Sequence, residues 1–129
     1  MLATYGFLPA TKGLDTIRMA TTFRWVQRNW DWPSTWGWDY PLMAMSATRL
    51  GLPGDAVDAL LMPEKKNTYL SNGHNFQDDR LRLYLPGNGG LLSAIALMCA
   101  GYDGGPGPDP GFPQNGKWKV RWEGLNELP

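Results

Sequence analysis

The stretch DYPLMAMSATRLGLPGDAVDALLMP, Asp39–Pro63, predicts two antiparallel helices joined by a tight turn. Apolar side chains recur at helical spacing on both sides of Gly51, and Pro53 suits the first turn of a helix. Glycine commonly ends a helix, and so short a connection places the second helix beside the first. We therefore expect helices over about 40–50 and 54–62.

One further helix is expected on each side of this hairpin. Residues 14–30 carry apolar side chains on one helical stripe, which includes Leu14, Ile17 and Phe23. Residues 90–101 are apolar on every side, which favours a helix that is buried all round.

The C-terminal part differs in composition. A connector rich in Gly and Pro follows the last helix, and the alternating residues KWKVRW, 117–122, predict a short strand. The predicted fold is mainly α, with antiparallel helical hairpins over about 14–101. The connector and β segment occupy 102–129, and residues 1–129 form one partial domain.

Charge and composition narrow the expected partners. Twelve basic and twelve acidic side chains cancel, so we expect neither nucleic acid nor a membrane as a partner. The single cysteine, Cys99, excludes an intrachain disulfide and lies in an apolar run typical of a buried, inert thiol. A lone histidine, His74, makes a transition-metal site improbable, and no cofactor is expected.

Cell location is left open by the sequence. The apolar run 91–101 is too short to span a bilayer, which takes about 20 residues. No basic region followed by a hydrophobic stretch occurs at the N-terminus, so we expect no signal peptide in this chain. A periplasmic or secreted parent protein stays compatible with these observations.

A second stretch, NWDWPSTWGWDYP at Asn29–Pro41, is unusually rich in aromatic side chains for a loop. Because the predicted helices alternate in direction, the loops at 31–39 and 63–90 should emerge at the same end. They would lie above the N-termini of two helices, where unpaired N–H groups favour polar ligands.

This end of the molecule is predicted to bind a sugar. Indole rings suit the apolar faces of pyranoses, and nearby polar side chains suit the hydroxyl groups. The alternative is that the tryptophans merely seal the helix ends. The candidate substrate-binding residues are Trp32, Trp36, Trp38, Tyr40, His74, Asn75, Arg80 and Asn88.

Glycoside hydrolysis would require a proton donor and a second carboxylate. Asp39 lies between two aromatic residues, although it could equally cap a helix. Asp78 and Asp79 could supply a base or could brace the loop by pairing with the arginines that follow them. Of the carboxylates at this end (Asp31, Asp39, Glu64, Asp78 and Asp79), the candidate catalytic residues are Asp39, Asp78 and Asp79.

Two segments carry a resemblance to a known family. WGWDYPLMAMSATRLGLPGDAVDALL and RLYLPGNGGLLSAIALMCAGYDG resemble the last helical hairpins of six-hairpin α/α-toroid glycoside hydrolases, above all the maltose-phosphorylase-like and α-L-fucosidase-like members. The similarity covers about Thr22 to Trp122. It implies part of an α/α toroid with a long active-site loop before the last inner helix.

Two departures from that family affect the expected activity. Pro86 stands where the fucosidase-like members carry the aspartate that serves in general-base catalysis, and proline cannot transfer a proton. A complete toroid has twelve helices, so these helices resemble only its C-terminal third, and the family's general acid would lie upstream.

The resulting hypothesis is a portion of a carbohydrate-active enzyme that contributes an aromatic wall to the sugar pocket. The alternative is a non-catalytic carbohydrate-binding or self-associating helical module. The expected partners are a carbohydrate and either a second copy of the chain or the remainder of a larger catalytic domain. We expect the isolated chain to lack glycosidase activity and to bind a saccharide weakly.

Overall fold

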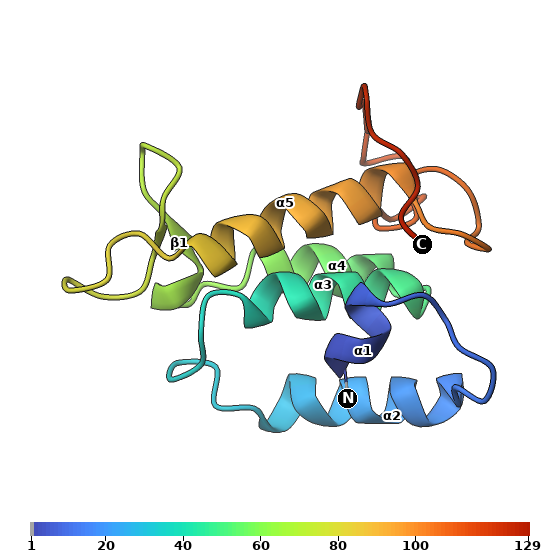
Figure 1. Ribbon diagram of the computed structural model, residues 1–129, viewed down its shortest axis with the longest axis horizontal. Helices are drawn as coiled ribbons and strands as arrows, with labels where there is room; N and C mark the ends of the chain where they lie inside the picture. The colour runs from blue at the N-terminus through green and yellow to red at the C-terminus, as the bar shows by residue number, and fades with distance from the viewer. Residues whose placement is uncertain (1) are drawn as a thin grey trace.

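The computed structural model describes residues 2–129 and is mainly helical (Figure 1). Between α4 and α5 lie a short 3-10 helix, η1 (Lys65–Asn67), and an antiparallel pair of strands, β1 (Thr68–Tyr69) and β2 (Asn75–Phe76). The α-helices are α1 (Leu2–Phe7), α2 (Thr16–Asn29), α3 (Asp39–Arg49), α4 (Pro53–Leu60) and α5 (Leu85–Ala100).

Helix α3 lies at the centre of the core. Nearly all of its residues are buried, and it packs against α1, α4 and α5. Tyr40, Met45 and Ala47 from α3 meet Met98 of α5 and Ala56 of α4 in one hydrophobic cluster. This central position explains why apolar or small residues occupy most positions of α3.

The predicted antiparallel hairpins are confirmed. Helices α3 and α4 are joined at Gly51, whose φ of 69° is left-handed and favours glycine. The α2–α3 loop and the segment containing β1 and β2 lie together at the opposite end from this turn (Figure 1). Two hydrogen bonds join these loops, from Gly37 N to Gln77 Oε1 at 2.9 Å and from Lys66 Nζ to Ser34 O at 2.8 Å.

Helix α2 begins two residues later than predicted and buries a different face. Asp15 caps it by accepting a hydrogen bond from Arg18 N at 3.0 Å. Met19 and Phe23 are buried, whereas Ile17 is exposed, so its assignment to the buried stripe was wrong. The side of α2 that carries Met19 and Phe23 therefore joins the hydrophobic core.

Helix α1 was not predicted from the sequence. A six-residue helix is too short to be stable alone and depends on tertiary contacts. Tyr5 Oη donates to Arg49 O at 2.8 Å, and Ser46 Oγ donates to Leu2 O at 3.2 Å. These bonds tie α1 to the far end of α3.

Helix α5 starts five residues before the predicted start at 90. Its first turns are rich in glycine because other residues approach closely there, and a Cβ on Gly90 would lie 2.8 Å from Pro41 Cγ. The prediction that this helix is buried all round was wrong. Leu92 is 70% exposed and Ile95 is 40% exposed, because α3 covers only one side of α5.

The predicted strand at 117–122 was also wrong. This segment contains no strand, because no neighbouring edge offers it a ladder of hydrogen bonds. Trp118 instead packs on Phe112, with ring centroids 5.3 Å apart, and Trp122 Nε1 donates to Asp109 Oδ1 at 3.1 Å. Among residues 2–129, no helix is both long and apolar enough to cross a membrane.

Candidate functional site

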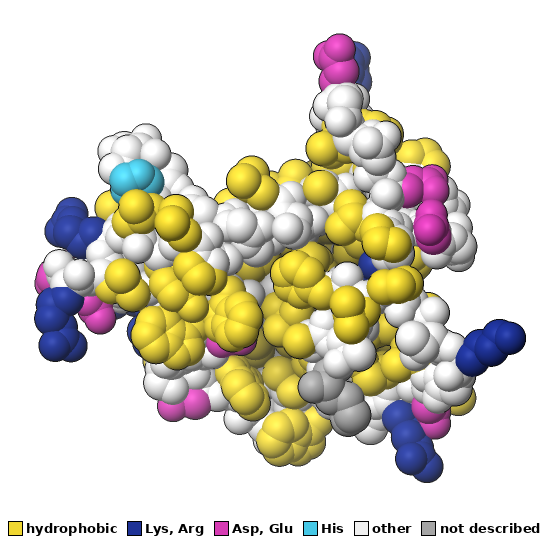
Figure 2. Space-filling model, in the orientation of Figure 1, with side chains coloured by type: hydrophobic (Ala, Val, Ile, Leu, Met, Phe, Trp, Pro, Cys, Tyr) yellow, Lys and Arg dark blue, Asp and Glu magenta, His cyan; other side chains and the backbone are white. Residues whose placement is uncertain are grey.

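A surface pocket with a volume of about 470 Å³ opens at the N-terminal end of α3, and we call it the tryptophan bowl. The loop between α2 and α3 supplies almost all of its wall. Hydrophobic side chains gather on this face, over the adjoining ends of α2 and α3 (Figure 2). The residues that line the tryptophan bowl are Trp30, Asp31, Ser34, Thr35, Trp36, Trp38 and Asp39.

The three indoles of the tryptophan bowl remain about half exposed: Trp30 at 47%, Trp36 at 49% and Trp38 at 48%. Trp36 is braced from outside the pocket, because its ring stacks on Tyr84 at 5.4 Å and Lys66 Nζ lies 5.2 Å from its centroid. Within residues 2–129, no ring–ring or cation–π contact involves Trp38. The same holds for Trp30, but Trp30 Nε1 donates a hydrogen bond to Thr35 Oγ1. Among the described residues, Trp38 is therefore the one indole of the tryptophan bowl with neither a ring contact nor an Nε1 hydrogen bond.

Two carboxylates lie among these indoles. Asp39 Oδ2 accepts hydrogen bonds from Trp36 N at 3.1 Å and from Thr35 Oγ1, which itself accepts one from Trp30 Nε1 at 3.0 Å. Asp31 Oδ2 accepts one from Ser34 Oγ at 2.6 Å. The hydrogen bonds found within residues 2–129 use neither Oδ1 atom, so each aspartate is held by one oxygen and can offer the other to a ligand.

The predicted role of Asp39 as a helix cap needs one correction. Trp38 occupies the N-cap position of α3, and Asp39 is the first residue of the helix. Its carboxylate accepts a hydrogen bond from the backbone N–H of Trp36, which precedes the N-cap by two residues. This bond holds the loop against the first turn of α3. The side chain therefore shapes the tryptophan bowl while remaining partly exposed to it.

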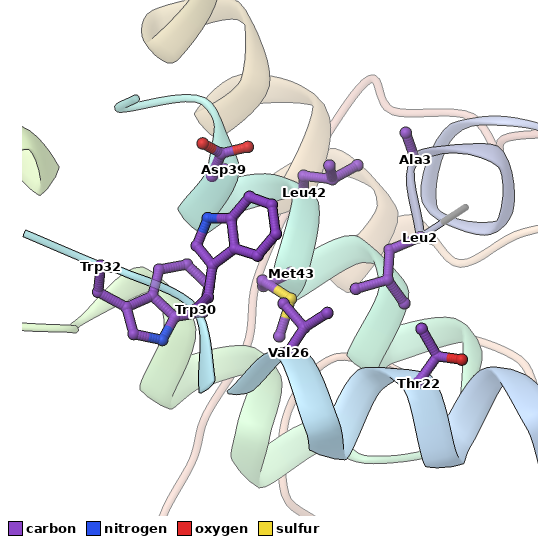
Figure 3. A pocket seen from close by; sticks show the side chains of 9 residues that line it. All are labelled: Leu2, Ala3, Thr22, Val26, Trp30, Trp32, Asp39, Leu42 and Met43. Carbon is purple, nitrogen blue, oxygen red and sulfur yellow. The ribbon is translucent and has the colours of Figure 1, made fainter. Parts of the chain in front are cut away.

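A second pocket, with a volume of about 240 Å³, adjoins the tryptophan bowl, and we call it the apolar slot (Figure 3). Trp30 and Asp39 line both pockets. In Figure 3 the Trp30 indole lies between Asp39 and Met43, and Leu2 and Ala3 of α1 lie on the other side of the space. The apolar slot is lined by Leu2, Ala3, Thr22, Val26, Trp30, Trp32, Asp39, Leu42 and Met43.

Buried amides hold the loops of this end together. Gln77 Nε2 donates to Asn75 Oδ1 at 2.8 Å, and Asn75 Nδ2 donates to the carbonyl oxygens of Lys66 at 3.1 Å and Thr68 at 3.2 Å. Both amides are almost completely buried, so they are satisfied only by these protein partners. Gly37, in the loop between α2 and α3, packs directly against the side-chain amides of Asn75 and Gln77.

The structure brings three of the predicted site residues together in the tryptophan bowl: Trp36, Trp38 and Asp39. Trp32 is only 9% exposed and contributes to the wall of the apolar slot, with its Nε1 donating to Gln27 O at 3.2 Å. It therefore cannot present a ring face to a sugar.

Tyr40 and Asn75 are fully buried, which corrects their assignment as substrate contacts. Tyr40 packs on Trp32 with centroids 5.6 Å apart and donates from Oη to Trp32 O at 2.9 Å. Burial raises the pKa of Tyr40 to about 12. Its hydroxyl therefore stays protonated and serves as a hydrogen-bond donor inside the core.

The remaining predicted residues lie on the β1–β2 hairpin or near it and line neither pocket: His74, Asp78, Asp79, Arg80 and Asn88. Asn88 joins the hairpin to α5, since its Oδ1 accepts from Asn75 N at 3.0 Å and its Nδ2 donates to Gly73 O at 2.7 Å. This geometry gives Asn88 a structural role.

Asp78 and Asp79 have the geometry of a surface turn. Asp78 Oδ1 accepts the N–H groups of Leu81 at 2.9 Å and Arg80 at 2.8 Å, and these bonds lower the pKa of its carboxyl group. A lowered pKa makes Asp78 a weaker base. Asp79 is highly exposed, and its Oδ1 lies 3.8 Å from Nη1 of Arg82. This agrees with the alternative prediction that the aspartates brace the loop by pairing with arginines.

Sequence reasoning left four members of the tryptophan bowl out of the site: Trp30, Asp31, Ser34 and Thr35. All four fall within the aromatic-rich stretch, and Asp31 had been considered among the carboxylates. One signal in the sequence could have identified them. Ser34 lies three residues from Asp31 and Thr35 lies four residues from Asp39, and at such short separations a hydroxyl group can donate a hydrogen bond to the carboxylate.

Within the described residues 2–129, no group of three or more His, Cys, Asp or Glu side chains is arranged to hold a metal ion. No protein-family model, curated protein or solved structure matches the chain. The glycoside hydrolase resemblance therefore stays a prediction from the two quoted segments.

Proposed function

We propose that the tryptophan bowl binds a saccharide, and that the chain contributes this aromatic wall to the sugar pocket of a glycoside hydrolase-like, carbohydrate-active protein. The observation that carries the proposal is the half-exposed indole of Trp38, which lines the tryptophan bowl beside the carboxylate of Asp39. Sugars combine apolar C–H faces with hydroxyl rims, and this pairing of indole with acceptor complements both. The finer assignment to an α/α toroid is part of the same proposal.

The expected affinity is low. The tryptophan bowl is open to solvent and contacts a ligand on one side only. Few contacts therefore offset the translational and rotational freedom that the ligand loses on binding. A dissociation constant of about 1 mM, equivalent to about −4 kcal/mol, is the expectation for the isolated chain. We expect no hydrolysis, because Pro86 offers no proton-transfer group at the position that resembles the family's base.

Saturation-transfer NMR with a panel of methyl glycosides tests the proposal. The Trp38→Ala variant should weaken binding of the preferred glycoside at least about tenfold, equivalent to about 1.4 kcal/mol. Trp25→Ala is the matched control, because Trp25 is 59% exposed on α2 and lies outside the tryptophan bowl. A panel in which no glycoside binds, or equal binding by both variants, would contradict the proposal.

A specific observation favours self-association as a second function. Helix α5 presents an apolar face of Leu85, Leu92 and Ile95, all of them exposed. Apolar residues clustered on one helix face commonly mark a contact surface. In sedimentation velocity, wild type should form dimers or larger species that dissociate in a Leu92→Glu variant, and a monomeric wild type would argue against this function.

A further inference from the structure

The tryptophan bowl and the apolar slot differ in chemistry although they adjoin. The bowl offers two carboxylates among its indoles, and the hydroxyl groups of Ser34 and Thr35 orient them. The slot extends from Trp30 and Asp39 into the space between α1, α2 and α3, where its wall is chiefly hydrocarbon and thioether (Figure 3). A ligand seated in the bowl and extending past Trp30 would enter an apolar environment.

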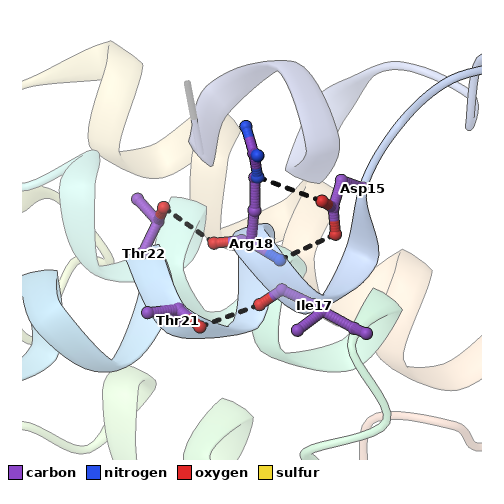
Figure 4. A network of polar contacts seen from close by, with 5 residues as sticks. All are labelled: Asp15, Ile17, Arg18, Thr21 and Thr22. Atoms are coloured by element: carbon purple, nitrogen blue, oxygen red, sulfur yellow. Dashed lines mark hydrogen bonds and ion pairs between the residues drawn. The ribbon is translucent and has the colours of Figure 1, made fainter.

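The polar groups of the apolar slot are few and partly occupied. Thr22 Oγ1 donates back to Arg18 O at 2.8 Å within α2 (Figure 4), so its hydroxyl hydrogen is used inside the helix. Asp39 lies at the boundary with the tryptophan bowl. Side chains such as Val26, Leu42 and Met43 give water few hydrogen-bonding partners, so an apolar group gains by displacing it.

The size of the apolar slot suits a small hydrocarbon group. Its volume of about 240 Å³ exceeds the roughly 150 Å³ of an apolar cavity that binds benzene. A chain of about six carbons or one aromatic ring therefore fits, whereas a second sugar unit would leave its hydroxyl groups without partners.

We propose that the site takes an amphipathic glycoside, with the sugar in the tryptophan bowl and an apolar aglycone in the apolar slot. This inference rests on the proposed saccharide binding and names its ligand class. Each methylene removed from water tightens binding about fourfold. If three of the five additional methylenes of a hexyl glycoside are buried, it should bind about sixtyfold more tightly than the methyl glycoside of the same sugar.

The test compares methyl and hexyl glycosides of each sugar in the panel, below the concentration at which the hexyl compounds form micelles. Dissociation constants come from protein NMR shifts. A Thr22→Phe variant fills the apolar slot and should reduce the hexyl glycoside to the affinity of the methyl glycoside, while leaving the methyl glycoside unchanged.

The matched control is Thr21→Phe. Thr21 is the residue before Thr22 in α2 and makes the same kind of bond, from Oγ1 to Ile17 O at 3.0 Å (Figure 4), but it does not line the apolar slot. It should retain the full preference for the hexyl compound. Ala3→Leu fills the slot from α1 and replaces Thr22→Phe if circular dichroism shows that the latter does not fold.

The outcomes separate the two proposals. Methyl glycosides that bind as tightly as hexyl glycosides would overturn the amphipathic ligand and leave saccharide binding intact. If neither methyl nor hexyl glycosides bind, both the saccharide-binding proposal and the amphipathic-ligand proposal are overturned. A hexyl preference that persists in Thr22→Phe and Ala3→Leu would place the alkyl chain elsewhere and overturn the inference.

Discussion

Replacing Gly87 by alanine should destabilise the protein through a single buried contact. A Cβ at Gly87 would overlap Oδ1 of Asn75 and lie 2.6 Å from its Cγ. Asn75 cannot move aside cheaply, because its amide is fixed between Gln77 and the carbonyl oxygens of Lys66 and Thr68.

The magnitude follows from three opposing contributions. Overpacking in a rigid interior costs about 1–3 kcal/mol, and displacement of a buried, hydrogen-bonded amide costs about 1–3 kcal/mol more. Alanine recovers about 0.5–1 kcal/mol through its higher helix propensity. The expected loss is about 1–5 kcal/mol with a midpoint of about 3 kcal/mol, and the melting temperature should fall by about 10 °C for a chain of this size.

Gly89→Ala is the matched control within the same helix. A Cβ at Gly89 would meet nothing within 4 Å, so only the gain in helix propensity remains, about 0.5–1 kcal/mol. Urea unfolding followed by circular dichroism measures both variants. A Gly87→Ala protein as stable as wild type, or a shift of the same sign in both variants, would refute the packing of α5 against the buried amides.

Three further outcomes are expected. Burial alone would raise the pKa of Asp55, but hydrogen bonds from Arg24 and Gln27 outweigh it and lower that pKa below 3.8. Asp55→Asn should therefore lower the free energy of unfolding by about 1–2 kcal/mol at pH 7. In urea titrations the difference in stability between wild type and variant should shrink as pH falls below 3.8. Cys99 is buried, and burial raises the pKa of its thiol, so a thiol reagent should label it only after denaturant is added, and labelling of the native protein within minutes would contradict this. Leu92→Glu should change the free energy of unfolding of the monomer by less than about 0.5 kcal/mol because Leu92 is 70% exposed. In urea titrations at a concentration where wild type is monomeric, a larger loss would mean that another part of the same chain covers α5 on that side.

Local patterns in the sequence were sufficient for the central hairpin. The spacing in α3 and the turn at Gly51 depend on interactions between near neighbours, and both agree with the structure. Helix α1 could not be foreseen, because six residues become helical only through bonds from Tyr5 and Ser46 across the core.

Tertiary contacts also decided the elements that were wrongly predicted. The glycines before residue 90 suggested a loop, yet α5 begins at Leu85 because Gly87 and Gly90 allow Asn75 and Pro41 to pack against the helix. The alternating residues at 117–122 had the pattern of a strand but lacked a partner edge.

The sequence was sufficient to predict where the candidate site lies but identified only some of the residues that form it. Alternating helix directions brought the two loops together, as the bond from Gly37 to Gln77 confirms. Composition could not distinguish an indole that faces solvent, such as Trp38, from one that is enclosed, such as Trp32. That difference depends on the ring of Tyr40 beneath Trp32, which is a contact set by the fold.

The indole N–H signals of the seven tryptophans in a ¹⁵N-correlated NMR spectrum test saccharide binding most directly, because each ring reports its own surroundings. During titration with the preferred methyl glycoside, the signals of the three tryptophans in the bowl should shift together along one millimolar binding curve, while those of Trp25, Trp118 and Trp122 stay in place. No shift with any sugar in the panel, or shifts confined to Trp118 and Trp122, would contradict saccharide binding in the tryptophan bowl.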